Sequence, residues 1–148
     1  MLFFNNVGCL GMCGHGLIGV VRTLAHMGRI TPGRVAIDTP VGLVSAELAQ
    51  DGAITIRNVP SSCHERDVSV DVPGVGLVTG AVAYGGNWFF IAHMDDEPIR
   101  LGRLVRLTDV TTRIRAALEA NGITGADGAE IDHIELTEPR ADGGARNF

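Results

Sequence analysis

Residues 10–16 read Leu-Gly-Met-Cys-Gly-His-Gly and run directly into residues 17–27, Leu-Ile-Gly-Val-Val-Arg-Thr-Leu-Ala-His-Met. The apolar residues of the second stretch lie almost all round a helical projection, which predicts a helix mostly covered by other structure. Gly28 stands where a C-terminal cap is expected. The glycines on both sides of Cys13 predict a loop, so this cysteine is expected at the N-terminus of the helix.

This position predicts a reactive thiol. The first N–H groups of a helix lack intrahelical partners and, with the helix dipole, they stabilise negative charge. A thiol placed there loses its proton more easily, and the thiolate is the reactive species. Gly14 and Gly16 leave the backbone bare for a small carboxylate, and His15 adds a donor beside it. The stretch therefore predicts one thiolate facing one bound carboxylate.

Two other interpretations stay open from the residues alone. A free cysteine is among the most buried residue types and is usually inert. Cys9, Cys13 and His15 are also close enough in sequence to be metal ligands, with Cys63 and His64 further along. Structural zinc sites, however, usually pair ligands about two to four residues apart at both ends, and the second pair is missing here. No metal is therefore predicted.

The stretch around Cys13 resembles the first cysteine motif of the proline racemase family. The most similar branch is the 4-hydroxyproline 2-epimerases, because of Gly16 and of residues 85–90, Gly-Gly-Asn-Trp-Phe-Phe. At the position of Gly16, proline racemases proper usually carry Asn, and trans-3-hydroxyproline dehydratases usually carry Ala. Other matching segments follow in family order along the chain: Phe3-Phe4-Asn5-Asn6-Val7-Gly8, Asp38-Thr39-Pro40-Val41-Gly42, Asn58-Val59-Pro60-Ser61, Asp71-Val72-Pro73-Gly74 and Ile131-Asp132-His133-Ile134-Glu135.

The resemblance implies a cofactor-free inversion at Cα that converts trans-4-hydroxy-L-proline to cis-4-hydroxy-D-proline. One cysteine thiolate removes the proton from one face, while a second cysteine thiol delivers a proton to the other. By this resemblance Cys13 is the first catalytic cysteine, Gly14 and His15 hold the substrate carboxylate, and His133 is a further substrate-binding residue. No cofactor is implied.

The resemblance also implies a second cysteine, in an Asp-x-x-x-Cys-Gly-Thr motif expected beyond Phe148, and strands expected before Met1. Neither Cys9 nor Cys63 matches that motif. The chain is thus expected to correspond to the middle of a longer family member and to hold one of the two bases. Leu17 departs from the family, which usually has a hydroxyl residue there that can cap the helix.

Three functional hypotheses follow. The first is a 4-hydroxyproline 2-epimerase. The second is another activity of the same family, a trans-3-hydroxy-L-proline dehydratase or a proline racemase, and the residue that identifies the dehydratase is expected beyond residue 148. The third is a non-catalytic remnant that binds a carboxylate or a metal.

Composition restricts the partners. The formal charge is −5 and no Lys/Arg run is present, which argues against a nucleic-acid partner. No stretch has the apolar length of a membrane span, and no signal peptide is expected. The three cysteines, an odd number, fit reduced thiols in a cytoplasm better than a disulfide framework. By the family resemblance, the expected partner is a small molecule, hydroxyproline or proline.

The remaining pattern predicts short strands and a second helix. Asn87, behind two glycines, is explained by a turn without a function, and Trp88, Phe89 and Phe90 are expected in the core. The polar residues 63–67 are expected to cross between lobes, and residues 139–148 are expected to be loose. Strands are predicted at 1–7, 35–38, 43–49, 53–59, 68–72, 77–83, 87–93 and 131–134, and an amphipathic helix over 104–121.

Helices enclosed by short antiparallel strands indicate an α+β class. The resemblance makes this the diaminopimelate-epimerase-like fold, in which two similar lobes each wrap a barrel-like antiparallel sheet around a central helix. Residues 1–63 are expected to form the later part of the first lobe and residues 64–148 the earlier part of the second, both incomplete. Unpaired sheet edges favour self-association, and a homodimer is one expected form.

Overall fold

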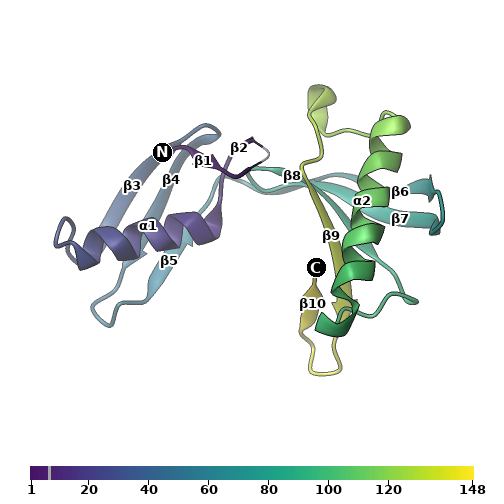
Figure 1. Ribbon diagram of the computed structural model, residues 1–148. Coiled ribbons are helices and arrows are strands. Elements are labelled where there is room, and N and C mark those ends of the chain that lie inside the picture. Colours follow the sequence, from purple (N-terminus) through teal and green to yellow (C-terminus); the bar gives the residue numbers. More distant parts are fainter. Residues whose placement is uncertain (7) are drawn as a thin grey trace. The chain divides into compact units, whose positions relative to one another are not determined.

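The computed structural model describes residues 1–6 and 8–148 (Figure 1). Val7, the last residue of the first expected strand, lies outside the described residues. The chain divides into two compact units. Unit 1 comprises Met1–Ser61 and Gly85–Asn87, and unit 2 comprises Ser62–Tyr84 and Trp88–Phe148. Unit 1 is therefore built from two separate segments of the sequence.

Unit 1 combines one helix with short antiparallel strands. The hairpin of β1 (Phe3–Phe4) and β2 (Cys9–Leu10) leads into α1 (Gly14–His26), and a three-stranded sheet follows in the order β3-β4-β5. These strands are β3 (Gly33–Thr39), β4 (Gly42–Leu48) and β5 (Ile54–Arg57), and both of their pairings are antiparallel.

The core of unit 1 lies between α1 and this sheet. Leu17 and Val21, one helical turn apart, are fully buried and belong to the same apolar cluster as three residues of β4: Val44, Ala46 and Leu48. Ile18 and Val20 of α1 are each 37% exposed. The prediction of a helix mostly covered by other structure is therefore wrong for the described residues, because the sheet covers one face of α1 (Figure 1).

Unit 2 is a five-stranded sheet with one long helix. Its strand order is β10-β9-β8-β7-β6, and every neighbouring pair is antiparallel except β8 and β9. Those two are parallel, unlike the antiparallel sheets expected, because the chain returns from β8 through α2 before it adds β9. The elements are β6 (Ser62–Val72), β7 (Gly76–Tyr84), β8 (Trp88–His93), η1 (Leu101–Arg103), α2 (Leu104–Ala120), η2 (Ala126–Gly128), β9 (His133–Pro139) and β10 (Ala145–Asn147).

The apolar face of α2 forms the core of unit 2 with the sheet. Leu107, Val110, Ile114 and Leu118 recur at helical spacing and are each at most 2% exposed. They share one apolar cluster with alternate residues of β6 and β7 and with Phe90 of β8. The amphipathic helix predicted over 104–121 is confirmed, and it ends one residue earlier.

Two local predictions are wrong. Residues 63–67, expected as a crossing between lobes, lie inside β6, where they are exposed and irregularly paired with β7. Residues 139–148, expected to be loose, form a hairpin of β9 and β10 whose turn is held by the ion pair of Arg140 and Asp142 and by Gly143 with φ of +81°.

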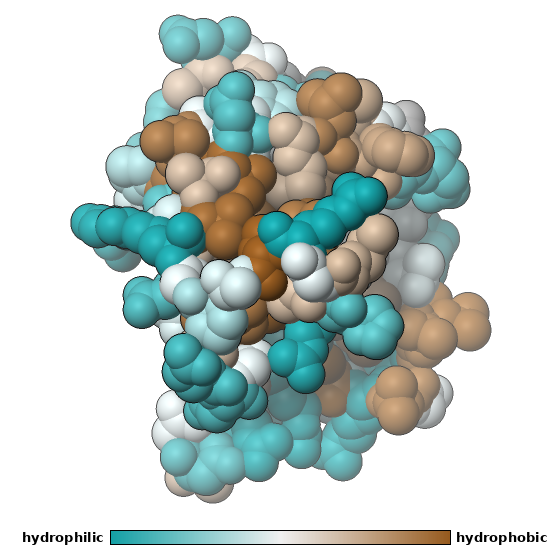
Figure 2. Space-filling view, turned by 90° about the vertical axis from the view of Figure 1, so that its left-hand side faces the viewer, coloured by the Kyte–Doolittle hydropathy of each residue, from teal (hydrophilic) through white to brown (hydrophobic). Residues whose placement is uncertain are grey.

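Some apolar side chains remain on the surface. The face drawn in Figure 2 shows hydrophobic surface between hydrophilic side chains. Phe4, Leu43 and Met27 of unit 1 are exposed by 78%, 70% and 55%. In the part of the chain that the structure describes, no helix is both long and apolar enough to cross a membrane.

Candidate active site

Cys13 is the N-cap residue of α1. Its backbone is extended, with φ of −140° and ψ of 109°, and the helix begins at the next residue. The N–H of Leu17 donates to the carbonyl of Cys13 at 2.9 Å, which closes the first helical turn. The N–H of Gly16 points at Sγ of Cys13, with 3.4 Å between nitrogen and sulfur. The sulfur therefore takes the place of the side-chain oxygen of an ordinary N-cap.

Two further N–H groups at this helix end are open. Among residues 1–6 and 8–148, the backbone N–H groups of Gly14 and His15 have no hydrogen-bond partner, as is usual at a helix N-terminus. Gly14 is half-buried, His15 is exposed, and the first turn of α1 contains no acidic residue. An anion at this end of α1 would meet two free donors and the positive end of the helix dipole. Cys13 and these two N–H groups thus lie at the same helix end, and a bound carboxylate there stays a prediction.

The glycines here also serve packing. A Cβ at Gly16 would lie 3.0 Å from the Phe3 ring and 3.4 Å from Sγ of Cys13, and a Cβ at Gly14 would lie 3.3 Å from Cδ1 of Ile56. Phe3 is 8% exposed. Gly14 and Gly16 therefore allow the helix end to pack closely against β1 and β5, in addition to leaving the backbone open.

The loop before Cys13 is held by a residue that sequence reasoning explained as a turn without function. Oδ1 of Asn87 accepts hydrogen bonds from the N–H groups of Gly11 at 2.9 Å and Met12 at 3.4 Å. Nδ2 of Asn87 donates to the carbonyl of Met12 at 2.6 Å. The partners lie about 75 residues apart in the sequence. The only sequence signal at this position was the pair of glycines before Asn87.

His133, the remaining predicted site residue, opens β9 in unit 2. Its ring stacks on Phe89, with 4.7 Å between ring centroids and 24° between ring planes. Nδ1 faces Oδ1 of Asp132, whose Oδ2 accepts the backbone N–H of Trp88 at 3.3 Å. The side chain of His133 is 38% exposed. Its ring is therefore oriented by two contacts, and the side chain remains partly exposed.

The predicted residues thus fall in two groups. Cys13, Gly14 and His15 lie together at the start of α1 in unit 1, and His133 lies in unit 2. Cys9, Cys13 and Cys63 are all free thiols. Among the described residues, no three His, Cys, Asp or Glu side chains gather where they could hold a metal ion.

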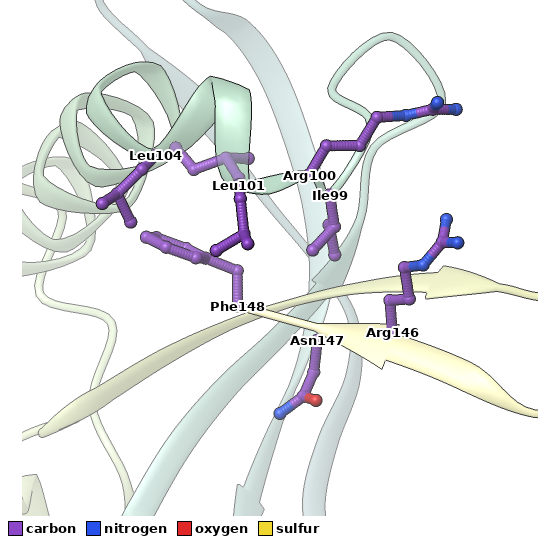
Figure 3. Close-up of a pocket in the computed structure, with 8 residues that line it drawn as sticks. Ile99, Arg100, Leu101, Leu104, Arg146, Asn147 and Phe148 are labelled. Atoms are coloured by element: carbon purple, nitrogen blue, oxygen red, sulfur yellow. The ribbon is translucent and has the colours of Figure 1, made fainter.

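A cavity of about 590 Å³ in unit 2 contains none of the predicted site residues. In Figure 3 the ring of Phe148 lies beside Leu101 and Leu104, while the guanidinium groups of Arg100 and Arg146 extend away from it. The lining is otherwise Ile99, Leu107 and Asn147. Its apolar character and the absence of Cys13 and His133 set it apart from the site at α1.

Comparison with known proteins identifies relatives over the whole chain. The family model described as proline racemase matches residues 1–148. Proteins named 4-hydroxyproline 2-epimerase from Xanthomonas campestris pv. campestris and Pseudomonas putida are 57% and 55% identical over 150 residues. Each match covers 100% of this chain and 48% of the relative. The chain therefore spans about half the length of the curated relatives it matches.

Solved structures share the fold at lower identity. A probable proline racemase from Agrobacterium radiobacter with bound carbonate superposes with a TM-score of 0.89 at 20% identity, covering 99% of this chain and 47% of that one. A hydroxyproline epimerase from Agrobacterium vitis with bound trans-4-hydroxy-L-proline superposes with a TM-score of 0.89 at 21% identity, covering 99% and 46%. The α+β architecture is thus shared with these proteins. With the match over its entire length, the chain belongs to the proline racemase family.

Proposed function

We propose that this chain carries part of the catalytic centre of a 4-hydroxyproline 2-epimerase, which converts trans-4-hydroxy-L-proline to cis-4-hydroxy-D-proline. The observation that carries the proposal is Cys13 as the N-cap of α1, beside the open N–H groups of Gly14 and His15. The identity of 51–57% to proteins named for this activity supports the choice of substrate.

In the proposed reaction, the substrate carboxylate accepts hydrogen bonds from the N–H groups of Gly14 and His15. The Cys13 thiolate, stabilised by the Gly16 N–H, takes the Cα proton from one face. The electron pair left at Cα delocalises into the carboxylate, which the helix N-terminus stabilises. A thiol on the opposite face returns one proton, so the reaction is redox-neutral and requires no cofactor.

The opposite thiol belongs to the part of the proposal that rests on family resemblance. Cys9 and Cys63 do not match the family's second cysteine motif, and both are exposed. We assign His133 to substrate binding through Nε2, since its Nδ1 already faces Asp132. Under this proposal, residues 1–63 are the later part of one lobe of the family fold, and residues 64–148 are the earlier part of the next.

Two expectations accompany this proposal. The proposed reaction needs reduced cysteines, so we expect the protein in the cytoplasm, where thiols stay reduced. Open sheet edges and exposed apolar residues of unit 1 favour self-association as a homodimer. Sedimentation equilibrium of the chain over a range of concentrations measures this association.

Protection of Cys13 from alkylation tests the proposal. Iodoacetamide labelling of the 148-residue chain, resolved by peptide mass spectrometry, gives a rate for each cysteine. We expect Cys13 to react faster than Cys9 and Cys63 at about pH 7, because the Gly16 N–H and the N-terminus of α1 stabilise negative charge on its sulfur. We expect trans-4-hydroxy-L-proline to slow labelling of Cys13 and to leave the other two rates unchanged.

Comparison of ligands separates the proposal from its alternatives. Protection by trans-4-hydroxy-L-proline at lower concentration than by L-proline or trans-3-hydroxy-L-proline supports the epimerase. Stronger protection by one of the other two ligands would identify another activity of the family. Equal rates at all three cysteines, or equal protection by acetate, would overturn the proposed substrate site. Conversion of the substrate in deuterated water, followed at Cα by NMR with Cys13→Ser as control, measures the reaction itself.

A further inference from the structure

We infer that Asn87 is a positioning residue, which holds the loop before Cys13 in the conformation that makes the thiol reactive. The inference rests on the role proposed for Cys13 and extends it to a residue 74 positions later in the sequence. Asn87 does not touch the sulfur. It acts through Gly11 and Met12, the two residues that precede Cys13.

The contacts of Asn87 match the chemistry of a primary amide. Oδ1 receives two N–H groups, from Gly11 and Met12, and Nδ2 supplies a donor to the Met12 carbonyl. Asp in this place would set a carboxylate oxygen against the Met12 carbonyl, and Ser or Thr could not reach all three groups. The amide thus acts toward the loop as a neighbouring strand would, supplying both donor and acceptor. Asn87 is half-buried, so the bonds are partly shielded from water.

Glycines in the cysteine loop and in the turn before β8 allow the Asn87 amide to reach the loop backbone. A Cβ at Gly11 would lie 2.3 Å from the carbonyl oxygen of Gly86 and 2.6 Å from Val41. A Cβ at Gly86 would lie 2.7 Å from Cβ of Met12, and the φ of Gly86 is +100°. Met12 is 3% exposed. The loop and the turn before β8 therefore pack closely, and neither Gly11 nor Gly86 has space for a side chain of its own.

The position of Met12 fixes that of Cys13. The extended backbone of Cys13 directs Sγ toward the N–H of Gly16, and the peptide that enters Cys13 is the one whose carbonyl Asn87 binds. Without this amide, the N–H groups of Gly11 and Met12 and the Met12 carbonyl would lose these bonds, and the loop could rotate. The cap geometry would then be populated less often, so the Gly16 N–H would stabilise negative charge on Sγ less often.

Asn58 provides a matched control. Its Nδ2 donates to the carbonyl of Gly85 at 2.7 Å, so it supports the same turn without touching the cysteine loop. We would compare wild-type chain, Asn87→Ala and Asn58→Ala by iodoacetamide labelling at about pH 7 and about pH 9.5, where most thiols are ionised. Circular dichroism melting of each variant measures its general stability.

We expect Asn87→Ala to slow Cys13 labelling about fivefold at the lower pH, the size of a typical hydrogen-bond contribution, and to change it less at the higher pH. Labelling of Cys9 and Cys63 should not change, and Asn58→Ala should label like the wild type. An unchanged Cys13 rate in Asn87→Ala, or an equal loss in Asn58→Ala, would overturn the inference. If wild-type Cys13 itself reacts no faster than Cys9, the proposed function fails instead.

Hydrogen exchange in the wild-type chain tests the contact without any substitution, should Asn87→Ala not fold. The amides of Gly11 and Met12 have Asn87 as their hydrogen-bond acceptor. We expect both to be protected, and the Gly11 amide more strongly because its bond is shorter. Exchange of these amides as fast as that of an exposed loop would contradict the inference.

Discussion

Asp132, the residue directly before His133, orients its imidazole: Oδ1 of Asp132 faces Nδ1 of the ring. A carboxylate accepts only, so the neutral ring carries its proton on Nδ1 and presents Nε2 as an acceptor. Asp132 is itself fixed by the backbone N–H of Trp88, and Arg115 donates to its carbonyl. The tautomer of a predicted substrate-binding residue is thus determined within unit 2.

The substitution Asp132→Ala should remove the preference of His133 for the Nδ1–H tautomer. We expect the Nδ1–H form to dominate in the wild type and to lose that dominance in Asp132→Ala, because the acceptor for Nδ1 is gone. Nitrogen chemical shifts of the ring measure this by NMR. Glu130→Ala, which removes a carboxylate that pairs with Arg115 at 3.6 Å, is the control and should leave the ring unchanged. The same spectrum in both variants would contradict the assignment.

Gly125→Ala should destabilise unit 2. A Cβ there would lie 2.3–2.7 Å from three ring carbons of Trp88, and the buried position leaves the ring little room. We expect a loss of about 1–3 kcal/mol in the free energy of unfolding, the usual cost of overpacking. Denaturant unfolding followed by fluorescence of Trp88, the only tryptophan, measures it. Gly102→Ala, where a Cβ meets nothing within 4 Å, should unfold like the wild type.

Glu97 should make the stability of unit 2 depend on acid pH. Burial raises the pKa of Glu97, but hydrogen bonds and charges of Arg106 and Arg103 outweigh burial and hold it below its ordinary 4.5. Because the pKa is lower in the folded state, the stabilisation is present above about pH 4.5 and is lost as the pH falls through the folded-state value.

The variant Glu97→Gln measures this contribution. We expect it to lower the free energy of unfolding by about 1–3 kcal/mol at neutral pH, since a buried charged partner of two arginines is removed. The difference from wild type should shrink as the pH drops below 4.5. Asp96→Asn, at an exposed neighbouring position, is the control. A difference that stays constant across this range would refute the role of ionised Glu97.

His93 should titrate above its ordinary pKa of 6.5. The largest cause is the hydrogen bond to the Thr137 carbonyl at 2.6 Å, followed by the bond to Asp95 at 3.0 Å. The raised pKa means that protonation stabilises the folded state below pH 6.5 and that this contribution disappears as the pH rises through the folded-state value. NMR titration of the ring should show this midpoint, and Asp95→Asn should lower it only in part, because Thr137 remains.

Several features of this fold could be predicted from local sequence. The 3.6-residue spacing from Leu107 to Leu118 predicts α2, and the glycines around Cys13 predict its place at the start of α1. β10 could not be predicted in this way, because its three residues are exposed, Arg146 and Asn147 are polar, and the strand exists only through its pairing with β9. The parallel pairing of β8 and β9 likewise depends on the path of the chain and not on either strand alone.

The placement of Cys13 at the start of α1 could be predicted because its signals are local. Cys13, Gly14 and His15 are consecutive, and helix-end physics alone indicates an anion site there. The proposed role of Asn87 could not be inferred locally, since its partners Gly11 and Met12 lie about 75 residues earlier in the sequence. A glycine-rich turn explains Asn87 equally well until the tertiary contact is known.

The division of unit 1 into Met1–Ser61 and Gly85–Asn87 has a consequence for the order of events on the ribosome. The loop at Met12 leaves the ribosome first, and the amide that holds it follows 75 residues later, about 4–15 s at ordinary rates of synthesis. A nascent chain thus carries Cys13 for seconds before its neighbourhood is complete. A chain cleaved between residues 61 and 85 would retain the cysteine and the helix but lose Asn87. Its thiol would then stay in the state that the nascent chain has before Asn87 is made.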